Sequence, residues 1–304
     1  IISGNNPPLN QVFQSSDHNL WLSTEKGVIF LQKMIFTRIY TTLNVVYVEA
    51  ISPDIENNRV YFSSKENIWS YSLADKQLNE IRFDNNAYFL SMKKVQNGLW
   101  VSNTSKIEFY KNNKMVFEKN FNLEGRSIFD MNSDKDGGCW FTQEGFKGVR
   151  RISPDFSIQK YGPEEGIIYE PTVVRVSENG IYTGTYDPRH YLLFKKTGSD
   201  IFVDISIPLP FSVPVDLRID DISFSDSIIW LASTSGLLKI VNGNISRVEL
   251  YEKNVTEMHV KSVESIKHSP FVLFCNSLGL FQLNYLNNEI SFYDENSGLP
   301  SNVI

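Results

Sequence analysis

The sequence has little cysteine, no long apolar run and no excess of basic charge. Its two cysteines, Cys139 and Cys275, are too few for a disulfide framework and lack the spacing of a metal site. No segment has the roughly 18 to 20 consecutive apolar residues of a membrane span, and residues 1–10 lack the basic and apolar regions of a signal peptide. The 29 basic residues are mixed with 35 acidic ones, so no basic stripe is present to neutralise a phosphate backbone. We therefore expect a soluble chain with no nucleic acid partner and no membrane contact, and we expect any targeting segment or anchor to lie outside it.

One stretch of the sequence, LWLSTEKGV at residues 20–28, recurs along the whole chain. A typical copy has a large apolar residue, a small polar cluster, a turn and a second apolar run. Successive copies are 40, 39, 40, 42, 48 and 43 residues apart, and a period of this length is the signature of a repeat architecture. The column that aligns with the first tryptophan is Trp21, Tyr61, Trp100, Trp140, Tyr182, Trp230 and Leu273.

The runs within a repeat predict strands rather than helices. They are short and alternating, they are rich in Val, Ile, Phe, Tyr and Thr, and they end at Asn, Asp, Gly or Lys. The first unit divides into four such runs, QVFQSS, LWLST, GVIFLQ and IFTRIY. A lone sheet of four short antiparallel strands cannot bury both its faces, so seven copies predict an all-β, seven-bladed β-propeller with the aromatic column between blades. A β-helix, whose rungs are much shorter, and two β-sandwiches, which give no reason for the column, are weaker alternatives.

The chain shows no internal boundary. No stretch of Pro, Gly or Ser is long enough to divide it, so we predict a single domain over residues 1–304. The widest insertion, at 204–222, contains three prolines and predicts a loop or an edge excursion. The ending GLPSNVI, at 298–304, is similar to the first strand of a further repeat. Alternatively, it closes the ring by pairing into the first or last blade.

The repeats resemble a known family. LWLSTEKGV, WLASTSGLLKI, SDKDGGCWFTQEGFKGVRRI and YDENSGLPSNVI are similar to the two-component regulator propeller repeat. In that repeat an Asp-Gly turn leads to Leu-Trp-x-Gly-Thr, a Gly-Leu follows, and Asn-Gly-Leu-Pro opens the next unit. The resemblance covers all seven copies unevenly, because the units at 60 and 181 lack the Trp and most of the Gly-Leu pattern. The usual Gly before Thr is replaced by Ser23, Ser102 and Ala232.

The resemblance implies a non-catalytic sensor region of a hybrid two-component system. Such propellers are typically extracytoplasmic, here periplasmic, and precede a β-sandwich, a membrane helix and a histidine kinase. They often control glycan use, which implies an oligosaccharide ligand. The implied partners are further propeller or sandwich domains of the same protein and a second copy of the chain in a homodimer. A propeller scaffold for protein–protein assembly is the alternative, and a glycan hydrolase or lyase is the weakest of the three.

The predicted ligand site lies on the face that carries the turns between second and third strands and the connections between blades. There the fourth blade contributes QEGFKG at 143–148, the fifth contributes TYDPRHY at 185–191, and YGPEEGIIYEPT at 161–172 connects them. Aromatic faces with carboxylates and a guanidinium suit sugar rings and hydroxyls, or an anionic sugar. The competing interpretation is that these are ordinary solvated turns. The predicted ligand-binding residues are Lys147, Glu165, Tyr169, Tyr186, Asp187, Arg189 and His190, with Glu164 and Tyr191 beside them.

Catalysis and metal binding have weaker support. A propeller hydrolase or lyase would need paired carboxylates in its axial channel, and the inner runs supply mainly Ser, Gln, Lys and Arg. Asp130 and Glu264 are the acidic exceptions and could face each other across the axis. No nucleophile motif or nucleotide fingerprint accompanies them, so we predict no catalytic residue and no cofactor. Asp130, Asp134 and Asp136 lack the residue order of an EF-hand calcium loop, so we predict no metal site.

Overall fold

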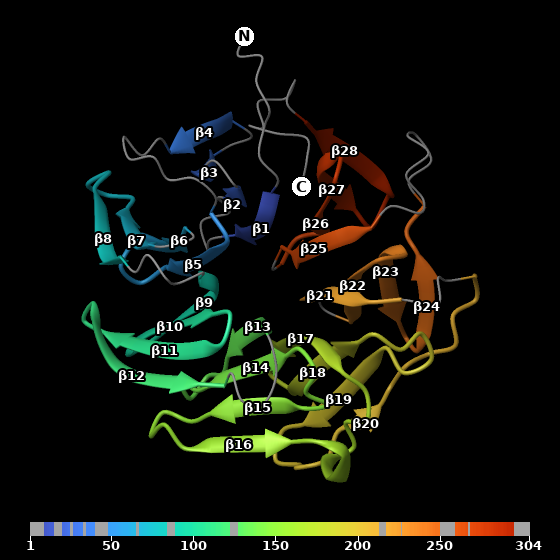
Figure 1. The fold of residues 1–304 in the computed structure, drawn as a ribbon. Helices are drawn as coiled ribbons and strands as arrows, with labels where there is room; N and C mark the ends of the chain where they lie inside the picture. The colour runs from blue at the N-terminus through green and yellow to red at the C-terminus, as the bar shows by residue number, and fades with distance from the viewer. Residues whose placement is uncertain are drawn as a thin grey trace.

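The protein is a ring of seven four-stranded antiparallel sheets, arranged as blades around a common axis (Figure 1). The computed structural model describes residues 9–14, 20–24, 27–32, 35–39, 48–64, 67–83, 89–121, 127–212, 217–225, 227–249, 259–266 and 268–294. In each blade the first strand lies nearest the axis and contacts the first strand of a neighbouring blade. The all-β, seven-bladed propeller predicted from the repeat is confirmed. No helix in these ranges is long and apolar enough to cross a membrane.

The strands of the first four blades follow one another along the chain. Blade 1 contains β1 (Leu9–Gln14), β2 (Leu20–Thr24), β3 (Gly27–Gln32) and β4 (Ile35–Ile39). Blade 2 contains β5 (Ala50–Asp54), β6 (Arg59–Ser63), β7 (Asn67–Ser72) and β8 (Leu78–Phe83). Blade 3 contains β9 (Phe89–Val95), β10 (Gly98–Asn103), β11 (Lys106–Lys111) and β12 (Lys114–Asn120). Blade 4 contains β13 (Ile128–Ser133), β14 (Cys139–Gln143), β15 (Val149–Ile152) and β16 (Ile158–Tyr161).

The last three blades repeat the same order after a short 3₁₀ turn, η1 (Pro163–Glu165). Blade 5 contains β17 (Pro171–Val176), β18 (Gly180–Thr185), β19 (Leu192–Lys196) and β20 (Val203–Asp204). Blade 6 contains β21 (Ile219–Ser225), β22 (Ile228–Ser233), β23 (Gly236–Val241) and β24 (Asn244–Arg247). Blade 7 contains β25 (Val260–Ser265), β26 (Phe271–Asn276), β27 (Gly279–Asn284) and β28 (Glu289–Tyr293).

The aromatic column predicted from the repeat lies between blades. Each of its seven residues belongs to, or packs against, a different hydrophobic cluster. Trp100 of blade 3, for example, shares its cluster with Met131 and Phe141 of blade 4. Its indole N–H donates a hydrogen bond to the carbonyl oxygen of Gly137, also in blade 4, at 2.9 Å. The column is therefore the element that fixes one blade against the next.

The ring closes by packing blade 7 against blade 1. Leu273 shares a cluster with Val12 and Leu22 of blade 1, and strand β25 contacts β1. In the described ranges all four strands of both blades come from consecutive sequence, so packing rather than a shared sheet joins them there. The ending at 298–304, predicted to start a further repeat or to pair into the ring, lies outside the described residues.

Two further features of the sequence are resolved by the fold. Cys139 and Cys275 are buried and unpaired, as the apolar runs around them predicted. Burial raises the pKa of Cys275 to about 12, which favours the protonated thiol over the reactive thiolate. In the insertion after β20, Ile205 and Phe211 are partly buried and pack against the core between blades 5 and 6. The described part of that insertion is thus a packed excursion rather than a free loop.

Polar side chains of the inner strands link several blades to the next one. The inner strand has no neighbour on its axial side, so its backbone N–H groups there need other acceptors. Side chains of the preceding blade supply them. The acceptor and donor pairs at 2.7 to 3.0 Å are Gln11 Oε1 with Ile51 N, Ser52 Oγ with Lys94 N, Asp130 Oδ2 with Val174 N, Asp221 Oδ2 with Val263 N, and Ser223 Oγ with Ser265 N. Asn132 Oδ1 accepts from Val176 N at 3.4 Å.

Candidate functional site

A cavity of about 1380 Å³ lies along the propeller axis. Its lining includes turns between first and second strands and between third and fourth strands. It includes no residue of the described turns between second and third strands, or of the described connections between blades. The axial cavity therefore opens on the face opposite to the loops predicted as a ligand site. Every inner strand contributes to its wall, including Gln11, Ser52, Lys93, Asn132, Arg175, Asp221 and Glu264.

β-Bulges determine which side chains reach the axial cavity. In blades 1, 3, 4, 5, 6 and 7 the pairing between the first two strands shifts near the start of the first strand. Such a bulge leaves one residue unpaired and changes the direction of the side chains around it. In blade 6 it separates two adjacent carboxylates, because Asp221 lines the axial cavity while Asp220 does not. The carboxylate oxygens of Asp220 instead lie 2.6 Å from Arg218 Nε and 2.6 Å from His259 Nε2.

Arg175 is the centre of a charged network at the axis. On β17 it lies between Asp130 of β13 and Asp221 of β21, with guanidinium nitrogens 2.5 Å from an oxygen of each carboxylate. Burial opposes its charge, but the two carboxylates raise the pKa of Arg175 above its usual value. Asp221 also accepts a hydrogen bond from Ser262 Oγ at 2.8 Å. Asp130, considered with Glu264 as a catalytic pair, is thus held in an ion pair and in a bond to the next blade.

Lys93 is a cation of the axial cavity that has no such partner among the residues the structure describes. It lies on β9 and lines the cavity, and its side chain forms no hydrogen bond or ion pair with any residue the structure describes. Burial lowers its pKa, and Arg175 lowers it further, against the opposing effect of Asp130, Asp221 and Glu264. Its ammonium group therefore presents three unused donors to the cavity, whose wall also contains the carboxylate of Glu264.

The three loops predicted as a ligand site do contact one another on the opposite face. The backbone N–H of Gly145 donates to Glu170 Oε1 at 2.9 Å, which joins the first loop to the connecting segment. The Tyr169 ring stacks on His190 with centroids 4.7 Å apart, which joins that segment to the third loop. His190 Nδ1 lies 2.5 Å from Asp204 Oδ2.

Several of the predicted ligand-binding residues are occupied by their own turns. Glu165 accepts the backbone N–H of Gly162 at 2.7 Å. Asp187 Oδ1 accepts the backbone N–H groups of Arg189 and His190 at 2.8 and 3.1 Å. The Asp187 contacts are typical of an Asx-type turn and the Glu165 contact is that of a capping box, so both carboxylates support their own loops.

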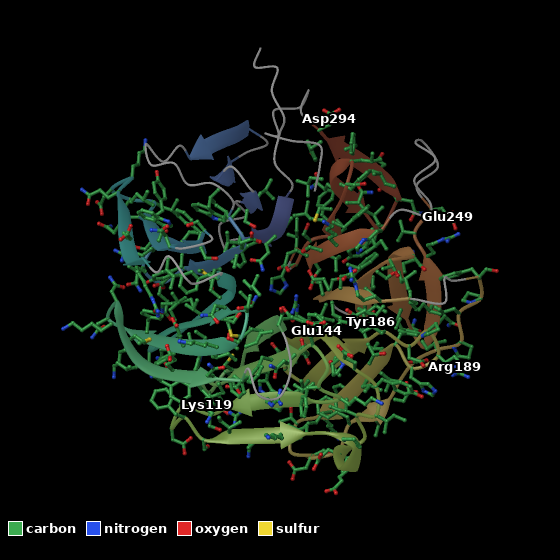
Figure 2. The ribbon with its side chains drawn as sticks, in the orientation of Figure 1. Lys119, Glu144, Tyr186, Arg189, Glu249 and Asp294 are labelled. Carbon is green, nitrogen blue, oxygen red and sulfur yellow. The ribbon has the colours of Figure 1, made fainter. Side chains whose placement is uncertain are left out.

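Of the remaining predicted residues, two are exposed to solvent and one lies nearer the propeller axis. Lys147 is exposed on its turn. The Arg189 side chain is 82% exposed, and Figure 2 shows it toward the outer edge of the ring, with Tyr186 nearer the axis. The Tyr186 ring lies under Arg218, with the guanidinium carbon 6.0 Å from the ring centroid. Arg218 was not among the residues predicted from the sequence. Tyr191, named beside the site, is fully buried and donates to the carbonyl oxygen of Ile207, so its role is structural.

The acidic cluster before Trp140 supports a turn. Asp134 accepts hydrogen bonds from the backbone of Asp136 and Gly138 and pairs with Arg151 at 2.7 Å. Burial opposes its ionisation, but the hydrogen bonds from Arg151 and Gly138 hold the pKa of Asp134 below its usual value. Across the described ranges, no group of three or more His, Cys, Asp or Glu side chains is placed to hold a metal ion.

The fold is similar to several solved propellers. No protein-family model matches the chain, and no curated protein matches it in sequence. The extracellular domain of the hybrid two-component system BT4673 from B. thetaiotaomicron superposes with a TM-score of 0.69 at 11% identity, over 96% of this chain and 46% of that one. Streptogramin B lyase gives 0.67 at 14% identity, over 84% and 86% of the two chains. YCF48 from Cyanidioschyzon merolae gives 0.69 at 13% identity, over 90% and 94%.

At these identities the likenesses show the β-propeller fold and nothing finer. The chain spans less than half the length of the BT4673 extracellular domain. The similar structures include an enzyme and a domain of a signalling protein, so the fold alone does not decide between catalysis and sensing. The function must be argued from the side chains in the axial cavity and in the loops.

Proposed function

We propose that this chain is a ligand-sensing propeller of a two-component signalling protein, located in the periplasm and responding to an oligosaccharide. The resemblance of its repeats to the two-component regulator propeller supports the class, as does the similarity of its fold to the BT4673 extracellular domain. On this proposal a histidine kinase, and further propeller or sandwich domains, belong to the same full-length protein.

The axial cavity is the observation that supports ligand binding. Its wall combines charged donors, Lys93 and Arg175, with the carboxylate of Glu264 and the hydroxyls of serines. Convergent donors and acceptors in a concave site suit a ligand with many hydroxyl groups. Lys93 offers unused donors there, because no described residue pairs with it.

The same cavity supports binding rather than catalysis. General acid–base chemistry on a glycosidic bond needs two carboxyl groups that can exchange protons with the substrate. Asp130 and Asp221 are held by Arg175 and by backbone N–H groups of the next blades, so neither is available as a partner carboxylate for Glu264. The proposed role is therefore non-catalytic.

Signal transmission would require the ligand to favour one arrangement of the protein over another. A ligand that binds two states equally shifts neither, however tightly it binds. We propose that the two states differ in how two copies of the chain, or this propeller and its neighbouring domain, pack together. The axial cavity joins all seven blades, so a ligand there can alter the whole ring.

We expect Lys93→Met to weaken oligosaccharide binding at least tenfold. The substitution keeps the length of the side chain and removes the ammonium, and a hydrogen bond to a charged group contributes about 1.5 to 3 kcal/mol. Isothermal titration calorimetry with a panel of neutral and acidic oligosaccharides measures the change. Lys119→Met, on the outer strand of the same blade (Figure 2), is the matched control and should leave the affinity unchanged. Binding that is equal in the Lys93 variant and the wild type would exclude the axial cavity, and turnover of a glycan by the wild type would contradict the non-catalytic role.

The loop site predicted from the sequence has its own test. Tyr186→Ala combined with Arg189→Ala removes an exposed aromatic ring and a highly exposed cation from that site. If the ligand binds in the axial cavity, calorimetry should show less than a twofold change in affinity. A tenfold loss in this double variant, with normal binding by Lys93→Met, would assign the ligand to the loops of blades 4 and 5 instead.

A further inference from the structure

A second cation lines the axial cavity without a counter-charge in contact. Lys195 lies on β19 and is 7% exposed. Its Nζ is 5.5 Å from the centroid of the Trp140 ring and 5.4 Å from that of Tyr161, in the recess between blades 4 and 5. Its ammonium group forms no hydrogen bond or ion pair within the part of the chain that the structure describes. We call this place the Lys195 recess.

The environment of Lys195 leaves its charge incompletely compensated. Burying an ammonium costs free energy unless it is paired and hydrogen-bonded. The two aromatic faces supply a partial compensation through cation–π attraction. These rings provide no oxygen acceptor for its three N–H donors.

The charged residues around Lys195 also leave its ammonium without a contacting carboxylate. Burial lowers its pKa; Arg151 lowers it as well, and Asp200 raises it. Arg151 is itself paired with Asp134 at 2.7 Å, and Asp136 lies 3.8 Å from it, so these carboxylates serve Arg151 rather than Lys195. Among the described residues no carboxylate contacts the ammonium directly, while the axial cavity reaches it.

We propose that the Lys195 recess receives an oxyanion of the ligand, a carboxylate or a sulfate, and that the sensed oligosaccharide is therefore acidic. This inference rests on the proposed function. An oxyanion entering from the axial cavity would accept hydrogen bonds from the ammonium at the point where the protein supplies no acceptor. Gln159 and Thr197 line the same cavity and add polar groups to its wall.

The test compares acidic ligands with their neutral counterparts. A tetragalacturonate probes the carboxylate and a κ-carrageenan tetrasaccharide probes the sulfate. Each is titrated beside its carboxyl-reduced or desulfated form. In the wild type we expect at least a tenfold preference for one acidic form, as for a charge-assisted hydrogen bond. The arm that shows the preference identifies the oxyanion.

Variants of two adjacent lysines then locate the preference. Lys195→Met keeps an apolar side chain over the aromatic rings and should abolish the preference, whereas Lys195→Arg should retain it. Lys196→Met, at the exposed next position of the same strand, is the control and should behave as the wild type. In the wild type the affinity for the acidic form should fall as pH rises through the lowered pKa of Lys195, because binding requires the ammonium, and this pH dependence should disappear in Lys195→Met.

The outcomes separate the inference from the proposed function. Equal affinity for acidic and neutral forms overturns the acidic ligand and leaves an oligosaccharide sensor standing. A preference that survives Lys195→Met overturns the assignment to the recess. No binding of either series to the wild type overturns the proposed function and the inference with it.

Discussion

Replacing Arg175 with Met should destabilise the propeller by about 3 to 5 kcal/mol, the range for breaking a buried ion pair from one side. The guanidinium is 18% exposed and separates the carboxylates of Asp130 and Asp221, which are 16% and 10% exposed. Without it two negative charges face each other at the axis in a poorly solvated space. The free energy of unfolding, from urea denaturation followed by circular dichroism, measures the loss.

A triple variant shows whether the loss is electrostatic. Adding Asp130→Asn and Asp221→Asn to Arg175→Met removes the unpaired charges and keeps an acceptor for Val174 N and Val263 N, so most of the stability should return. A triple variant that is as unstable as Arg175→Met would show that lost packing, not charge, causes the deficit.

The blades could be predicted because the sequence pattern that defines each strand is local. Alternating apolar residues and turn residues define strands over five or six positions. The four runs expected in the first unit match β1 to β4 within one or two residues. The column at Trp21 needed only the repeat period, since the same position in each blade meets the same kind of neighbour.

The axial network could not be predicted because it joins distant positions. Arg175 meets carboxylates 45 and 46 residues away, and the pairing depends on ring closure and on bulges that composition does not reveal. A signal for Lys195 was present, because in the run LLFKK it shares a strand face with Leu193, which is buried, whereas Lys196 faces solvent. Strand alternation applied to charged residues would have identified it.

The predicted loop site shows a second limit of sequence analysis, which is that residue type alone does not separate ligand contacts from turn contacts. Asp187 and Glu165 belong to a residue class that suits a sugar and equally suits a turn. Only the hydrogen bonds to the backbone of Arg189, His190 and Gly162 distinguish the two roles. Composition identified where unusual loops lie, but the structure was needed to show which side chains remain available to a ligand.

The largest apolar effect is expected at Trp230, whose replacement with Ala should cost about 3 to 5 kcal/mol. The side chain is 0% exposed and shares a cluster with Val260 and Val263 of the next blade. Its indole N–H donates to Ser225 Oγ at 2.8 Å, so the substitution also leaves that hydroxyl without its donor. Equilibrium urea denaturation gives the difference from the wild type.

The control for Trp230→Ala is Leu286→Ala, because Leu286 is 77% exposed and should change stability by less than about 0.5 kcal/mol. If the aromatic column holds blade against blade, Trp230→Ala should loosen blades 6 and 7 together, since its neighbours belong to both. Faster amide hydrogen exchange in β22 and β25 would show this. A loss below about 1 kcal/mol, or faster exchange confined to β22, would mean that each blade is stable by itself and that the repeated tryptophan does not join neighbours.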